Sequence, residues 1–482
     1  MSSGLFAALA TAANSLDVLE QAMGVVQNNV TNASTPGYAA QSLNFEARSF
    51  SPSENLWGGV ASAGLADSRN AFAEEAVWNH NEQLGAATAS ATNLSALQSL
   101  FNVSGTSGIP AALSTLYSAF SAWSNNPNDG PSQTQVLNAA QGLAQALNST
   151  ANNVDQLRSQ TDQQLQSTVT QINALATQIA QLNNAIRQGD RNDPGLQAQL
   201  YNDLEQLSNL MSITVQTEPD GTVTVMIAGQ APLVTGGTAT TLDVEFPPDP
   251  TPTYPAAPPD AHIVVKSNGQ DLNSIVSSSS GQIAALLQFR NVTIPSVIGG
   301  PEVQGSINQL AQSIADQVNA LLTSGQTISG APGVPLFTYN SSLPTSIART
   351  LALNPAITAS QLAPIDPGPP AVANGIADQL AQLSSTGTVS GTSMTYTDFY
   401  SSIAQSIGNQ QASASAAQQT ESQLLSQAQN ARAQLEGVSL NEQAAQLVQF
   451  QQSYEAAAQM ISVISNTTQY LITMMQQIQS VA

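Results

Sequence analysis

The sequence predicts a mainly α-helical protein with β inserts (α+β), and three patterns carry this prediction. At both ends of the chain, apolar residues recur at alternating steps of three and four, which is the spacing of a coiled-coil seam. A similar seam runs from Val154 to Ile186. Alternation of apolar and polar residues, the spacing of strands, appears mainly between residues 213 and 266. We therefore expect a paired N- and C-terminal coiled-coil stalk, a long-helix bundle domain and a small inserted β domain.

The two terminal helices are expected to be partners. The first covers residues 4–32 and ends in a cluster of turn formers with a Pro-Gly break. The last covers about 439–477 and opens with the capping box Ser439-Leu440-Asn441-Glu442. Each seam needs an apolar partner, and the other terminus offers one. The residues that we assign to this seam are Leu9, Leu16, Leu19, Met23, Val26 and Val30 in the first helix, and Leu447, Phe450, Tyr454, Ile461, Ile464 and Leu471 in the last.

The interior of the chain alternates between helical and extended patterns. Expected helices cover residues 68–101, 111–123, 133–187, 196–211, 281–290, 301–322 and 395–435. A β-hairpin is expected around the turn Pro219-Asp220-Gly221, and further strands at 242–246 and 263–266. The stretch 247–260 is half proline and is expected to be an exposed loop. Residues 323–395, rich in Gly, Pro, Ser and Thr, fit either a second insert or a long irregular cover.

These patterns divide the chain into seven expected segments. The first four are an N-terminal helix with an extended segment (1–60), the first part of a helical domain (61–207), an inserted β domain (208–275) and the return of the helical domain (276–325). The last three are an insert whose fold the sequence does not predict (326–395), the last helix of the helical domain (396–438) and the C-terminal helix (439–482).

The composition excludes several classes of partner. The chain has 482 residues and a formal net charge of -22, and its single lysine and eight arginines are scattered. Nucleic-acid binding needs a clustered basic patch, so we expect none, and an anionic membrane surface is disfavoured for the same reason. No run of about 18 apolar residues occurs, so we expect no membrane insertion. The first residues lack a basic region, and a cleaved secretory signal is not expected.

No motif in the sequence predicts catalysis. The chain has no cysteine, and its two histidines, His80 and His262, lie in unrelated segments without metal-ligand spacing. Phosphate-binding and nucleophile motifs rich in glycine are missing as well. We therefore expect no enzyme activity, no cofactor and no metal.

Two terminal motifs point to a family. The first, Asn28-Asn29-Val30-Thr31-Asn32-Ala33-Ser34-Thr35-Pro36-Gly37-Tyr38, resembles the N-terminal signature of the bacterial flagellar axial proteins, which are rod, hook and hook-associated proteins. The family often has a basic residue soon after the tyrosine, where this chain has Ala39-Ala40-Gln41. The second, residues 440–454 followed by 456–458 and Ile461, is similar to the family's C-terminal signature. The signature turn residues that we single out are Asn29, Asn32, Thr35, Pro36, Gly37 and Tyr38.

The middle of the chain resembles one branch of this family, which occupies the hook–filament junction. The similarity lies in residues 113–127, 136–141, 168–183 and 301–322. It implies a structural adaptor of the flagellum, extracellular and required for filament assembly. The implied partners are further copies of the chain, the hook protein, the next hook-associated protein, the flagellar type III export apparatus, and an export chaperone at the C-terminal helix.

Three alternatives stay open at this point. Without the resemblance, the seams fit the helices of one globular bundle. Within the family, a hook or distal rod protein is possible, although the middles of those proteins are mostly β. Outside the family, a secreted coiled-coil adhesin or binding protein would leave the paired terminal motifs unexplained.

Overall fold

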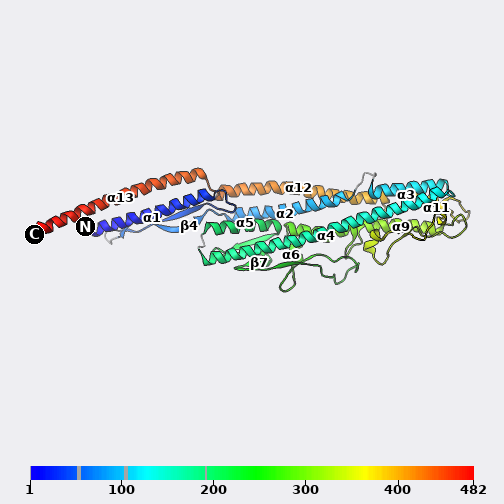
Figure 1. Ribbon diagram of the computed structural model, residues 1–482, viewed down its shortest axis with the longest axis horizontal. Coiled ribbons are helices and arrows are strands. Elements are labelled where there is room, and N and C mark those ends of the chain that lie inside the picture. Colours follow the sequence, from blue (N-terminus) through cyan, green and yellow to red (C-terminus); the bar gives the residue numbers. More distant parts are fainter. Residues whose placement is uncertain (1, 52–55, 102–106, 190–192, 482) are drawn as a thin grey trace.

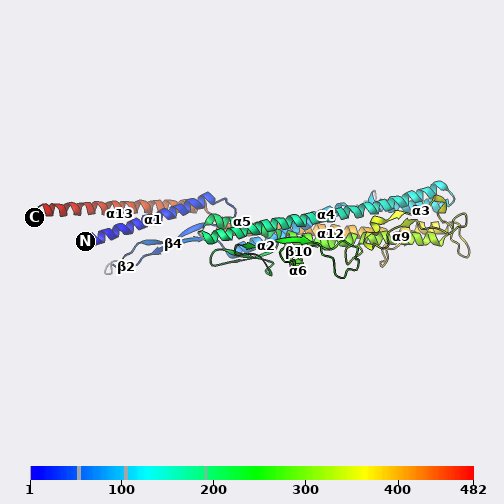
Figure 2. The same cartoon turned by 60° about the horizontal axis from the view of Figure 1, so that its bottom comes forward.

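The protein is an elongated, mainly helical molecule with both termini at the same end (Figure 1). The computed structural model describes residues 2–51, 56–101, 107–189 and 193–481. Helices α1 (Ser2–Asn32) and α13 (Leu440–Val481) run antiparallel, side by side in both views, and form the stalk (Figures 1 and 2). The other helices and the larger sheets form a longer body. The predicted pairing of the two terminal helices is thus what the structure shows.

A long β-hairpin runs back from the body along the stalk. Its antiparallel strands are β1 (Gln41–Ala47) and β4 (Val60–Asp67), and β2 (Phe50–Ser51) pairs with β3 (Leu56–Trp57) farther out. The hairpin packs on α1, and the rings of Phe45 and Phe450 lie 6.1 Å apart, so it also contacts α13. The stalk is therefore two helices and a hairpin, where the sequence predicted two helices and an extended segment.

Long helices form the frame of the body, and a polar side chain caps the start of most of them. Asn70, Asp129, Asp193 and Thr395 each accept a hydrogen bond from an amide of the following first turn. The 59 residues of α4 make it the spine of the body. These helices match the predicted ranges closely and are α2 (Ala71–Ser99), α3 (Gly108–Asn125), α4 (Gly130–Gln188), α5 (Pro194–Leu210) and α12 (Tyr396–Glu436).

Two antiparallel sheets lie against α4. The first has the order β5-β6-β7-β8, with β5 (Ile213–Thr217) at its edge, then β6 (Val223–Ile227), β7 (Ala231–Thr235) and β8 (Thr238–Ala239). The second joins β9 (Leu242–Glu245), β10 (His262–Val265) and β11 (Gln270–Asp271). The predicted hairpin is confirmed, because β5 and β6 pair around the turn at Asp220.

Short elements complete the body. They are α6 (Asn273–Ser277), α7 (Gln282–Gln288), η2 (Phe289–Thr293), α8 (Ile294–Ile298), α9 (Ser306–Ser324), β12 (Phe337–Thr338), η3 (Pro344–Ser346), α10 (Ile347–Thr350), β13 (Ala352–Leu353), η4 (Ala359–Gln361) and α11 (Gly375–Thr386). Residues 326–395, whose fold the sequence left open, bury apolar side chains such as Phe337 and Leu380 in the core. They are an integral part of the body.

Two hydrophobic cores share the spine α4. One contains α4 side chains up to Leu157, together with α3, α9 and α11. The other begins at Leu165 and contains α5, α7 and both sheets. The strands of 208–275 therefore have no core of their own. A polar turn of α4 separates the two cores, and there Asp162 accepts from Arg290 at 2.6 Å.

The packing predicts unequal protection from hydrogen exchange along the chain. In a dilute solution of single chains, amides of α13 beyond Ala457 should exchange early, because only one face of the helix is covered there and most of its side chains are exposed. Amides of α4 around Leu143 and Ile172, both fully buried, should exchange late. Hydrogen exchange followed by mass spectrometry measures both segments in one sample. Equal protection of the two would contradict this picture of the stalk.

Candidate assembly site at the base of the terminal helices

The covered face of α1 is turned slightly from the predicted seam. Its most buried residues are Ala12, Val18, Ala22, Val26 and Asn29. Of the residues assigned to the seam, Val26 is buried, whereas Leu9, Leu16, Leu19 and Met23 are half-buried. Val30 is 46% exposed, and the neighbouring Asn29 takes the position that faces α13. The reason is that α1 contacts the β1–β4 hairpin as well as α13, which the helical periodicity alone did not reveal.

The covered face of α13 coincides with the predicted seam over most of its length. Its half-buried positions include Leu447, Phe450, Tyr454, Ile461 and Ile464. Leu471 is 37% exposed, because α13 continues past the start of α1 (Figure 1). The opposite side carries the large exposed apolar side chains of Val448, Val463, Tyr470 and Met474, with Met460 at its border. Ile472 and Met475 are also exposed, but their spacing places them on the seam side, where α13 extends past α1. The single chain therefore leaves an apolar surface on α13 uncovered.

The side chain of Asn29 connects the elements of the stalk to one another where α1 ends. Its Nδ2 donates to the carbonyl of Gln41 at 2.8 Å and to Oε1 of Gln443 at 2.9 Å. Its Oδ1 accepts from the Tyr38 hydroxyl at 2.8 Å and from the Gln41 amide at 2.9 Å. An asparagine side chain can make about four hydrogen bonds, so its capacity is filled. One buried side chain thus ties α1 to the signature turn, to β1 and to the first turn of α13.

The signature turn attaches the stalk to the body. The Thr35 amide and hydroxyl donate to the carbonyl and Oδ1 of Asn32, at 2.9 and 3.1 Å, and the Tyr38 amide donates to the Thr35 carbonyl. Gly37 has a φ of +74° and lies so close to α5 that a Cβ would come within 2.2 Å of the Ala198 carbonyl oxygen. Pro36, between Thr35 and Gly37, is exposed. Burial raises the pKa of Tyr38 to about 12, which keeps its hydroxyl a donor.

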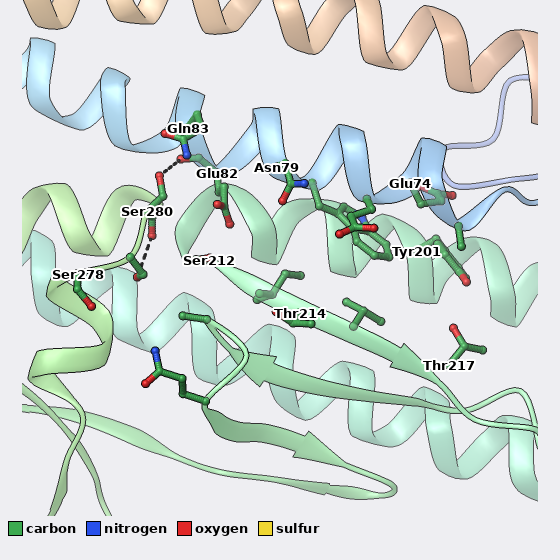
Figure 3. Close-up of a pocket in the computed structure, with 18 residues that line it drawn as sticks. Glu74, Asn79, Glu82, Gln83, Tyr201, Ser212, Thr214, Thr217, Ser278 and Ser280 are labelled. Carbon is green, nitrogen blue, oxygen red and sulfur yellow. Dashed lines mark hydrogen bonds between the residues drawn. The ribbon is translucent and has the colours of Figure 1, made fainter.

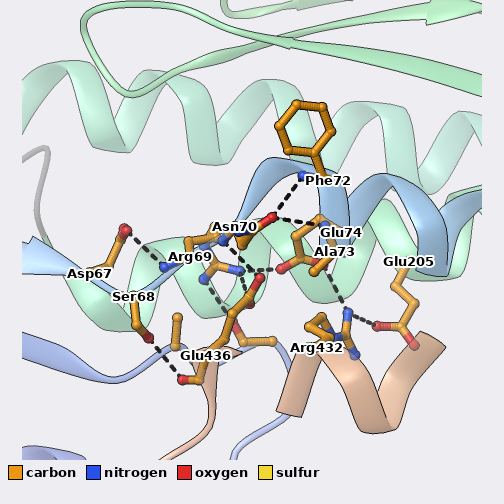
Figure 4. Close-up of polar contacts among 12 residues, drawn as sticks. Asp67, Ser68, Arg69, Asn70, Phe72, Ala73, Glu74, Glu205, Arg432 and Glu436 are labelled. Carbon is orange, nitrogen blue, oxygen red and sulfur yellow. Dashed lines mark hydrogen bonds and ion pairs between the residues drawn. The ribbon is translucent and has the colours of Figure 1, made fainter. Parts of the chain in front are cut away.

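A cluster of charged side chains lies directly behind this turn (Figure 4). The carboxylate of Glu74, on α2, is buried and contacts Arg69 at 2.6 Å and Arg432 of α12 at 2.9 Å. Arg432 also contacts Glu205 of α5 at 2.8 Å. Arg69 donates to the carbonyl of Gly37 at 2.9 Å. Two arginines and two glutamates therefore link three helices of the body to the signature turn.

Glu436, the last residue of α12, extends the cluster to the hairpin. Its Oε1 accepts from the Asn70 amide at 2.9 Å, and its backbone carbonyl accepts from the Ala40 amide and the Ser68 hydroxyl at 2.8 and 2.9 Å (Figure 4). Burial raises the pKa of this carboxyl to about 7, although the hydrogen bond from Asn70 opposes the shift. Glu436 therefore changes charge near neutral pH.

No pattern in the sequence predicts this charged cluster. Arg69, Glu74, Glu205, Arg432 and Glu436 come from distant parts of the chain and form no motif. One signal could have pointed to it. Only 8% of the residues are charged, so an arginine directly before a helix, such as Arg69, is unusual in this chain.

Two kinds of feature are missing from the described residues. Within the described ranges, no three or more His, Asp or Glu side chains gather in a way that could hold a metal ion. The same part of the chain contains no helix with the length and apolar character needed to cross a membrane.

Replacing Asn29 with leucine should loosen the stalk. Leucine has a similar size but cannot replace the four hydrogen bonds, and buried partners such as Gln443 would stay unpaired. The attachment of the stalk should weaken by about 1–3 kcal/mol. Hydrogen exchange in α1 and the first turns of α13 should accelerate, with α4 unchanged. Asn28→Leu, on the exposed side of the same turn, is the matched control. Unchanged exchange in Asn29→Leu would mean that the network does not hold the stalk.

Glu436→Gln should change the pH dependence of stability. A carboxyl whose pKa is raised on folding stabilises the folded state at low pH, and this contribution is lost as the pH rises through about 7. The glutamine keeps an acceptor for Asn70 and has no charge to bury. Its Tm should exceed that of the native chain by about 1–3 °C near pH 8, and the gain should shrink near pH 5. Calorimetry at both pH values measures this, with Glu455→Gln on exposed α13 as control. A gain that is equal at both values would contradict the assignment.

Comparison with known proteins agrees with this geometry. The family model described as the flagellar hook-associated protein FlgK helical domain matches residues 94–337, about half of the chain. Flagellar hook-associated protein 1 of Bacillus subtilis (strain 168) is 24% identical over 95% of this chain and 96% of its own length. The protein of the same name from Salmonella typhimurium is 22% identical over 68% of this chain and 59% of its own.

A solved structure shares the fold. The flagellar hook junction protein FlgK from Burkholderia pseudomallei matches with a TM-score of 0.65 and 18% identity, over 75% of this chain and 100% of that one. The family model covers a large part of the helical body, which in the sequence lies between the two terminal helices. Those helices pair with each other as their apolar seams predicted. The chain belongs to the family of flagellar hook-associated proteins that is defined by the FlgK helical domain.

Proposed function

We propose that this protein is a structural adaptor between the hook and the filament of a bacterial flagellum. The family and the printed names of its relatives, hook-associated and hook junction proteins, support this role. In this proposal the terminal helices form the inner layer of the assembly around its axis. The helical body forms the next layer, and the β strands of 213–271 lie outward.

The observation that carries the proposal is the uncovered apolar face of α13. Val463 and Tyr470 are 63% and 75% exposed, and Met460 and Met474 lie on the same helix with similar exposure. Exposed apolar patches of this kind mark protein contacts. A neighbouring copy packed beside the stalk would bury them. When such a contact uses two different surfaces, each added subunit repeats it, which produces an open helical array.

We propose that further copies of the chain, the hook protein and the next hook-associated protein are the neighbours. Their terminal helices would continue the same inner layer on either side. The neutral polar surface suits this arrangement, since only 8% of residues are charged and stacked identical subunits repel through every exposed like charge.

The same apolar face gives a reason for a chaperone before assembly. We propose that the chain leaves the cell through the flagellar type III export apparatus, directed by its N-terminal segment. An export chaperone would cover α13, whose two apolar sides are both unprotected when α1 is not yet paired with it.

Immunogold labelling of intact isolated flagella tests the location. Antibodies against residues 247–260, which contain exposed positions, should label one narrow band where the hook meets the filament. Label along the whole hook or the rod would assign the chain to another member of the axial family. Absence of label from every axial structure would overturn the proposal and favour a secreted binding protein.

A substitution on α13 tests the observation itself within the same flagella. Val463→Glu should remove the band and leave the secreted chain folded, because a carboxylate would be buried at the contact. Gln469→Glu, which adds the same charge at an exposed polar position about a quarter turn away from the line of Val463 and Tyr470, should keep the band.

A further inference from the structure

A groove opens between α2 and the edge of the first sheet (Figure 3). Its volume is about 650 Å³. One wall is the α2 face with Glu74, Trp78 and Glu82, and the other is strand β5 with Ile213 and Val215. Residues 278–280 form one end of the groove. Thr214 on β5 and Gln83 on α2 are exposed, so the groove is open to solvent.

The edge of β5 is unpaired along this groove. In the order β5-β6-β7-β8, β6 is the one strand that pairs with β5 among the described residues. The amides of Ala228 and Glu218 bond to the carbonyls of Ser212 and Thr222, which fixes the even-numbered residues of β5 as those that bond to β6. The main-chain groups of Ile213, Val215 and Thr217 therefore point to the groove. The Ile213 amide is engaged by the carboxylate of Glu82.

Two buried polar groups in the groove lack the partners that their chemistry calls for. The Nε1–H of Trp78 is buried and has no acceptor among the described residues. The carboxylate of Glu82 accepts from Ser212 and Ile213, but the described residues give it no cation, and burial raises its pKa. Buried donors and charges normally have partners, so each group calls for one, an acceptor for Trp78 and a cation for Glu82.

We propose that this groove binds an extended peptide segment of another protein, which adds a strand to the edge of β5 and places a lysine or arginine beside Glu82. Strand addition to an exposed sheet edge is a recurring mode of peptide recognition. Val215 would supply the main-chain hydrogen bonds, and a peptide carbonyl could accept from Trp78. The five residues of β5 set the length of the segment at about five or six residues.

The lining of the groove argues for a basic segment. It contains three glutamates, Glu74, Glu75 and Glu82, and no lysine or arginine among its described residues. Glu74 is already neutralised by Arg69 and Arg432, and Glu75 is exposed to solvent, so Glu82 is the buried carboxylate left for the peptide. A second copy of this chain is a poor source, because it has only nine basic residues against 31 acidic ones and at least five of the nine lie in internal ion pairs.

The test uses the full-length chain and a random heptapeptide library displayed on phage. Selection on the native chain should enrich extended sequences with β-branched residues and one basic residue. Synthetic peptides of these sequences are then titrated by calorimetry. Val215→Pro, which removes the outward amide at an edge position where proline is tolerated, should lower their affinity at least tenfold. Gln216→Ala, on the same strand but outside the groove lining, should leave the affinity unchanged.

Glu82→Gln removes the negative charge of Glu82 and leaves the shape of the groove nearly unchanged, so it tests the contribution of the charge alone. It should lower the affinity of the basic peptide about three- to tenfold, and it should not weaken a peptide with leucine in place of the basic residue. Circular dichroism confirms that each variant is folded. Failure to enrich any peptide, or enriched peptides that bind Val215→Pro as well as the native chain, would overturn the proposal. Concentration-dependent self-association that Val215→Pro abolishes would also overturn it, in favour of a second copy as the occupant.

Discussion

The buried carboxylate of Glu74 is the contact on which the arrangement of stalk and body depends. It holds Arg69, which reaches the signature turn, and Arg432, which comes from the helix that leads into α13. A buried ion pair adds little net stability, because both charges lose their hydration. Removing one partner, however, leaves the other charge buried alone. The cluster therefore selects one geometry for the two connections between stalk and body, the signature turn and the end of α12.

This use of charge extends to the whole body. Of the nine basic residues, Arg69, Arg158, Arg290, Arg349 and Arg432 all lie in ion pairs inside the molecule. Arg158, on α4, and Arg290 and Arg349, from η2 and α10, contact Asp155 and Asp162 at the polar turn of α4 between the two cores. Arginines that form internal ion pairs add no positive charge to the surface. The surface is therefore made of acidic side chains and uncharged polar ones. The same allocation explains why Glu82, in the groove between α2 and β5, has no cation beside it among the described residues.

Local patterns in the sequence predicted most of the helices and part of the site. Most positions of the predicted α13 seam lie on the covered face of α13, because α13 packs mainly on α1 and the period of a helix is local. The α1 seam was predicted less well, since a hairpin from residues 41–67 shares its covered face. Asn29 was singled out by its motif, but its contact with Gln443 crosses the chain. Glu205 and Arg432 could not be found, because an ion pair between residues 227 positions apart leaves no periodic trace.

The two ends of the stalk differ in a way that gives each a separate task. Near the body, Asn29, Gly37 and Glu436 fix the helices through buried polar contacts that tolerate little displacement. Toward the termini, α13 is held by one face only and extends beyond α1. Apolar burial is non-directional, and each Å² removed from water contributes about 25 cal/mol. A neighbouring subunit can therefore cover the outer part of the stalk without a unique partner residue. The buried polar contacts near the body keep the stalk and the body at a fixed angle.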